Sequence, residues 1–126
     1  MYDYTVYCTP EQTKKALELG APIDKDMYAP IIRYEQPWYC IDKEKSFAYH
    51  IPTAEQMIGW LEEKDEIQEF DIAIWEDPLW SSIVHLKNKP AIILKKTYRT
   101  RKEATIAAID AALEYLMSLH HDFLNG

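Results

Sequence analysis

Residues Thr100 to Leu119, with the sequence TRKEATIAAIDAALEYLMSL, carry the strongest helix signal in this chain of 126 residues. Thr100 and Glu103 have the spacing of a capping box, in which the two side chains bond the first turn of a helix. Alanine lets a neighbouring element approach closely, so we expect a β-sheet to pack against this helix. We expect the end of the helix to fray from His120 to Phe123. Small and apolar residues recur every three or four positions along its expected inner face: Ala104, Ala107, Ala108, Ala111, Ala112, Leu116 and Leu119.

The same capping chemistry recurs twice upstream. Thr9 and Gln12 predict a helix that ends at Gly20. Thr53 and Gln56 predict a second helix, which reaches about Lys64. Residues 21–29 are expected to form a loop, and alternating apolar residues predict strands elsewhere: Tyr2 to Cys8, Pro30 to Tyr34, Trp38 to Asp42, Phe47 to Ile51, Phe70 to Trp75, Leu79 to Leu86 and Ala91 to Lys95.

These elements predict one α+β domain that covers residues 1–126. A small mixed or antiparallel sheet should pack against the long C-terminal helix and the helix that starts at Thr53. With 48% hydrophobic residues, a chain of this length can bury a core without metal or disulfide staples. No run of 18 apolar residues and no signal-peptide pattern is present, so we expect a cytoplasmic protein that does not enter a membrane.

Charge is segregated along the sequence. Residues 62–77 contain eight acidic residues and one lysine, whereas residues 78–102 contain seven basic residues and no acid. These segments could be two solvated faces, whose surface ion pairs contribute little to stability. They could also be complementary patches that join subunits head to tail or meet a partner. The sequence leaves both interpretations open.

Enzyme motifs are missing from the sequence. Three glycines are too few for a phosphate-binding loop, and no serine has a G-x-S-x-G context. Cys8 or Cys40 could act as a nucleophile with a histidine as its base. Both cysteines, however, have the apolar surroundings that are typical of reduced, buried thiols. The sequence does not decide whether Cys8 and Cys40 form a disulfide. His120 and His121 are adjacent and point around a helix. We therefore expect no catalytic residue, no cofactor and no metal site.

Aromatic residues give a hint of function. The chain has nine tyrosines, four tryptophans and three phenylalanines. Tyrosine and tryptophan dominate the binding energy of many protein interfaces. We therefore expect a homo-oligomer or a protein partner, with a candidate interaction surface made of Trp38, Tyr39, Trp75 and Trp80.

Several segments together carry a resemblance that spans nearly the whole chain. These are TPEQ and ALELG between residues 9 and 20, WYCID at residues 38–42, IPTAEQMIGWLEEK at residues 51–64 and the alanine-rich closing helix. Their order resembles a group of small uncharacterised proteins from gut Bacteroidetes and their phages or mobile elements. The resemblance implies a fold and a phage or mobile-element setting, and it supplies no site residues.

The start of the closing helix is also similar to the final helix of double-stranded RNA-binding domains. In that family, basic residues at this position contact phosphates. The similarity implies this role for Arg101 and Lys102, with Lys95, Lys96 and Arg99 nearby, although Thr105 stands where that family has a further lysine. The leading hypothesis is thus a small interaction or accessory protein, and the alternative is nucleic-acid binding through residues 95–102.

Overall fold

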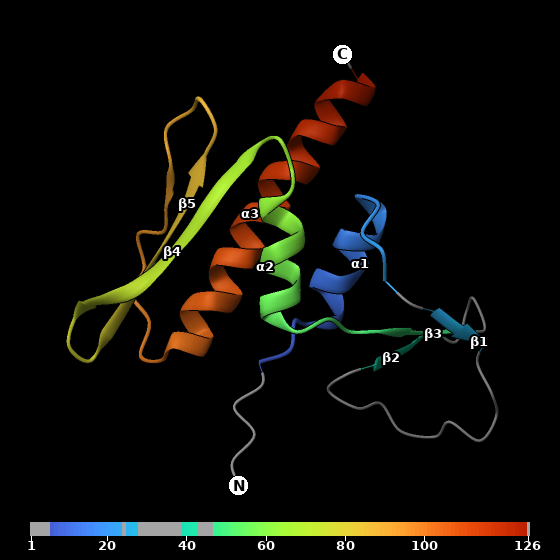
Figure 1. The fold of residues 1–126 in the computed structure, drawn as a ribbon, viewed down its shortest axis with the longest axis horizontal. Coiled ribbons are helices and arrows are strands. Elements are labelled where there is room, and N and C mark those ends of the chain that lie inside the picture. Colours follow the sequence, from blue (N-terminus) through green and yellow to red (C-terminus); the bar gives the residue numbers. More distant parts are fainter. Residues whose placement is uncertain (1–5, 24, 28–38, 43–46, 126) are drawn as a thin grey trace, which may run out of the picture.

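The computed structural model describes residues 6–23, 25–27, 39–42 and 47–125, and it shows an α+β protein (Figure 1). This confirms the predicted fold class. No helix in these ranges combines the length and the apolar character that a bilayer span requires. The elements follow in the order α1 (Pro10–Glu18), β1 (Lys25–Met27), β2 (Tyr39–Asp42), β3 (Phe47–His50), α2 (Ala54–Glu62), β4 (Ile67–Glu76), β5 (Leu79–Leu86), β6 (Ile92–Ile93) and α3 (Arg101–Asn125).

The strands divide between two antiparallel sheets of three strands each. The larger sheet has the order β4-β5-β6, and the smaller has the order β1-β3-β2. The helices lie between them in Figure 1, where β4 and β5 are on one side of α3 and the smaller sheet is on the other. The larger sheet packs on α3, and β4 also contacts α2, which confirms the predicted packing.

Helix α3 forms the centre of the fold because the middle of its alanine-rich face is buried, although Ala107 and Ala111 at the border of that face are only half-buried. Ala104, Ala108 and Ala112 have no exposed surface. The buried Ser82 hydroxyl of β5 donates to the Ala104 carbonyl over 2.6 Å, so the strand lies close to the backbone of the helix here. At the helix start, the Glu103 N–H donates to Thr100 Oγ1 over 3.1 Å. The expected fraying after His120 is wrong, since the helix continues to Asn125 and its sequence has no glycine or proline before Gly126.

Both upstream capping boxes are confirmed. Thr9 Oγ1 accepts from the Gln12 N–H at 3.1 Å, while Gln12 Oε1 accepts from the Thr9 N–H at 3.1 Å. Thr53 and Gln56 repeat the arrangement in α2 at 3.1 and 3.0 Å. Gly20 follows α1 with φ of 90°, a conformation that favours glycine.

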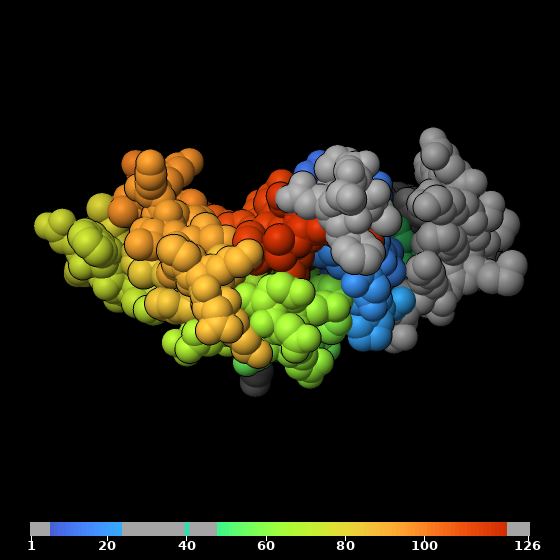
Figure 2. All heavy atoms as spheres, turned by 90° about the horizontal axis from the view of Figure 1, so that it is seen from above, coloured from blue at the N-terminus to red at the C-terminus, as the bar shows by residue number. Residues whose placement is uncertain are grey.

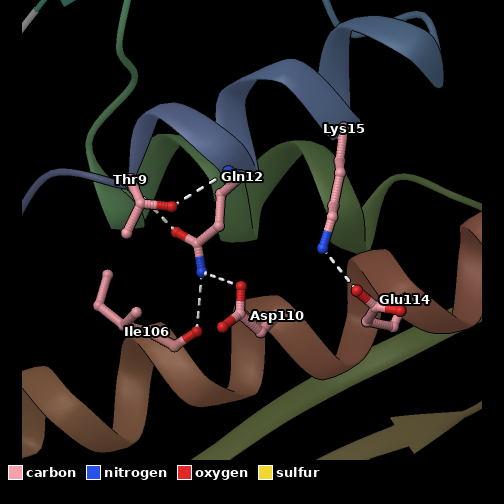
Figure 3. A network of polar contacts seen from close by, with 6 residues as sticks. All are labelled: Thr9, Gln12, Lys15, Ile106, Asp110 and Glu114. Carbon is pink, nitrogen blue, oxygen red and sulfur yellow. Dashed lines mark hydrogen bonds and ion pairs between the residues drawn. The ribbon is translucent and has the colours of Figure 1, made fainter.

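Gln12 does more than cap its own helix. Its side chain is buried, and Nε2 donates to the Ile106 carbonyl at 2.9 Å and to Asp110 Oδ1 at 2.8 Å (Figure 3). A Lys15–Glu114 ion pair lies one turn further along the same two helices. Helix α1 is therefore attached to α3 by polar contacts as well as by apolar packing.

Three strand predictions need correction or lie outside the ranges. The strand predicted from Tyr2 to Cys8 is wrong for residues 6–8, because Tyr7 makes only an isolated bridge to Thr53 and residues 1–5 are outside the described part. The prediction of a loop at residues 21–29 is wrong for residues 25–27, which form β1 and pair with β3 in an antiparallel ladder. The strand predicted from Ala91 to Lys95 is too long, since β6 contains only Ile92 and Ile93. Pro90, just before it, has no N–H to donate to a neighbouring strand. The strand predicted at residues 30–34 is not described.

Candidate interaction surface

The strands β4 and β5 form a hairpin with one apolar inner face. Ile72 lies opposite Ser82 and Ile74 lies opposite Trp80, and directly opposed residues share a face of the sheet. Ser82 and Val84 are buried against the helices, so Phe70 and Ile72 face the helices as well. Ile74 continues this alternation, yet 53% of its surface is exposed. The hairpin extends beyond the start of α3, so α3 does not cover the residues around the turn between β4 and β5 (Figure 1).

We call residues 73–80 the hairpin end. Trp75 is 73% exposed and follows the exposed Ile74. The register shifts between Ile74 and Glu76, so Trp75 is the additional residue of a β-bulge. Trp80 is half-buried, and its backbone exchanges hydrogen bonds of 2.7 and 2.9 Å with Tyr98. Figure 2 shows the hairpin end as one extremity of the molecule, so large apolar side chains lie on a projecting and supported backbone.

The predicted cluster of four aromatic residues is not one surface. Trp75 and Trp80 share the hairpin end, but Tyr39 belongs to β2 in the smaller sheet, on the far side of α3 (Figure 1). Trp38 lies outside the described residues. The sequence interpretation missed Ile74 and Ile93, which is 66% exposed. The alternation from Phe70 to Trp75 predicts a strand, but it does not tell how much of one face of that strand a helix covers.

The five predicted phosphate-contacting residues are all exposed. Lys95, Lys96 and Arg99 lie in the connection from β6, and Arg101 and Lys102 occupy the first turn of α3. Within the described ranges, none of them forms a salt bridge. Lys96 Nζ lies 6.0 Å from the centre of the Tyr98 ring. The acidic side chains that precede them along the chain are exposed too: Glu69, Asp71, Glu76 and Asp77.

No protein-family model, curated protein or solved structure matches this chain. No three His, Cys, Asp or Glu side chains gather closely enough to hold a metal ion in the part of the chain that the structure describes. The hairpin end presents the exposed apolar side chains of Ile74 and Trp75 beside the exposed carboxylates of Glu76 and Asp77.

The thiol of Cys8 is unsuited to nucleophilic chemistry. Both Cys8 and Cys40 are buried thiols, as expected from the sequence. Cys8 Sγ donates to the Thr53 carbonyl at 3.8 Å. Burial, together with the smaller effect of the negative charge of Asp110, raises the pKa of Cys8 from 9.0 to about 12. The reactive thiolate is therefore not formed at neutral pH.

This pKa predicts how stability responds to alkaline pH. Between about pH 9 and pH 12 the unfolded chain has lost the Cys8 proton while the folded chain retains it, so the free energy of unfolding falls as pH rises. Below pH 9 the contribution is complete. We expect Cys8→Ala to be less sensitive to pH over this interval than the wild type, as measured by urea denaturation at each pH. Parallel curves for the two proteins would contradict the assignment, because the other titrating groups are common to both.

Proposed function

We propose that this chain is a small interaction protein, without catalytic activity of its own, that associates with a second copy of itself through the hairpin end, in a phage or mobile-element setting. The observation that carries the proposal is the exposure of Ile74 and Trp75 together on a hairpin that projects past α3. Tryptophan is among the residues that contribute most to binding when an interface buries them. Exposed apolar patches of this kind mark interaction sites.

The charge pattern supports the same proposal. The exposed acids of β4 and the turn after it lie on the hairpin, while the exposed bases lie between β6 and α3. A two-fold contact can place the acids of each copy against the bases of the other, and such a contact closes as a dimer. Such complementarity sets orientation and association rate, and salt weakens it.

Trp75→Ser tests the proposal. We expect the wild-type chain to sediment as a dimer at high concentration, and Trp75→Ser to weaken the dimer by about 2 kcal/mol or more, which is about thirtyfold in the dissociation constant. Sedimentation velocity over a concentration series measures this. The fold should be intact in the variant because the side chain it removes is exposed.

Ile93→Ser is the matched control, since it removes a similarly exposed apolar side chain from the opposite edge of the larger sheet. It should leave the dimer unchanged. A wild-type chain that stays monomeric up to about 1 mM, or a Trp75→Ser variant that dimerises normally, would overturn the proposal.

The second candidate is nucleic-acid binding through Lys95, Lys96, Arg99, Arg101 and Lys102. Its support is that all five side chains are exposed and come from one short segment. The net charge of −7 opposes it. Titration with double-stranded RNA at about 50 and about 200 mM salt separates the candidates, because phosphate contacts lose affinity steeply as salt rises.

A further inference from the structure

The strand β4 has an open edge whose backbone direction can be assigned. The Ser82 carbonyl of β5 accepts a hydrogen bond from the Leu94 N–H at 3.1 Å, so the backbone N–H and C=O groups of Ser82 point toward the β6 side of the sheet. Ile72 lies opposite Ser82 in the β4–β5 pair. In an antiparallel ladder, hydrogen-bonded and non-hydrogen-bonded pairs alternate. The backbone N–H and C=O groups of Ile72 therefore point away from β5. The Phe70 N–H agrees, since it donates to Glu62 Oε2 at 3.3 Å on that side. In the ranges that the structure describes, the outward N–H and C=O groups of Ile72 and Ile74 have no backbone partner.

An open groove of about 700 Å³ adjoins this edge. Ile72 of β4 and Ile58 of α2 supply apolar lining. Arg101 and Lys102 enter the groove from the first turn of α3, and Glu55 lines it from α2. Two cations against one carboxylate leave the lining positive, although the chain as a whole is acidic. Neither cation forms a salt bridge within the described ranges.

We propose that β4 binds an extended acidic peptide segment of a partner protein as an added strand. The peptide backbone pairs with the outward groups of Ile72 and Ile74, which is the strand-addition mode of peptide recognition. Alternate side chains of the added strand point to one face, so acidic side chains at every second position reach Arg101 and Lys102. This site shares Ile74 with the hairpin end but uses the backbone groups of that residue, and it does not depend on the proposed self-association.

Backbone chemistry favours a peptide over a nucleic acid. The edge offers carbonyl acceptors as well as N–H donors at Ile72 and Ile74, and a peptide strand satisfies both kinds of group. Phosphate oxygens only accept hydrogen bonds, so phosphate contacts would leave these carbonyls without a donor. Glu55 also disfavours a ligand that carries a negative charge at every repeat.

The probe is a fluorescein-labelled ten-residue peptide of alternating glutamate and valine, titrated at about 50 mM salt and followed by fluorescence anisotropy. The full chain carries Trp75→Ser in every titration, so loss of self-association cannot be mistaken for loss of peptide binding. We expect saturable binding that a lysine–valine peptide does not show. Methylation of alternate backbone nitrogens in the acidic peptide should abolish binding, because it removes the donors that pair with β4.

Arg101→Glu with Lys102→Glu should weaken binding by at least about tenfold. Glutamate suits the first turn of a helix, so α3 should form normally in this variant. Lys95→Glu with Lys96→Glu makes the same change of charge outside the groove lining and should alter binding less than about threefold. No saturable binding up to about 1 mM, equal binding of the methylated peptide, or equal losses in the two double variants would each overturn the proposal. Tighter binding of single-stranded RNA than of the peptide would assign the groove to nucleic acid instead.

Discussion

Ile109→Ala should lower the free energy of unfolding by about 2 to 5 kcal/mol, the largest single-residue effect on stability that we expect. Ile109 lies in the middle of α3 and has no exposed surface. Truncation loses the transfer free energy of three carbon atoms and leaves a cavity that the rigid helix face cannot close. Urea denaturation followed by far-ultraviolet circular dichroism measures the change.

Ile93→Ala is the matched control, because it is the same truncation at a side chain that is 66% exposed. Its effect should stay within about 0.5 kcal/mol. The better helix propensity of alanine offsets only a few tenths of a kcal/mol at Ile109. Similar losses in the two variants would mean that α3 is not the centre of the core.

Gln12→Ala should cost about 2 to 4 kcal/mol, because it removes both hydrogen bonds from the Gln12 side chain to α3 and leaves only the Lys15–Glu114 ion pair of the polar contacts described above. The bond to the Asp110 carboxylate is charge-assisted and contributes about 1.5 to 3 kcal/mol, and the neutral bond to the Ile106 carbonyl contributes about 0.5 to 1.5 kcal/mol. The variant also loses the bond from Gln12 Oε1 to the Thr9 N–H. Thermal or urea unfolding measures the sum.

Gln56→Ala isolates the contacts to α3 from the capping bond. Gln56 occupies the same position in the α2 capping box and accepts from the Thr53 N–H at 3.0 Å, but its side chain is exposed and makes no hydrogen bond to α3. Its loss should cost about 0.5 to 1 kcal/mol. If the two variants lose equal stability, the α1–α3 contacts contribute nothing beyond capping.

Local signals were sufficient to predict the helices. A capping box joins residues three positions apart, and the alanine face of α3 repeats within four, so both are readable without knowing what packs against them. The alternation from Phe70 to Trp75 likewise predicted the strand β4. The exposed basic segment at residues 95–102 and the buried state of Cys8 also followed from residue type and neighbourhood.

Tertiary structure decided the remaining features. Gln12 and Ile106 are 94 residues apart, and nothing near either residue predicts that they meet. The division of the strands between two sheets depends on long-range pairing as well.

The candidate surface also depends on tertiary structure, because the exposure of Ile74 and Trp75 follows from where α3 begins relative to the hairpin. Periodicity reports which way a side chain points along its own strand. It does not report how far the covering helix extends, and burial depends on that extent.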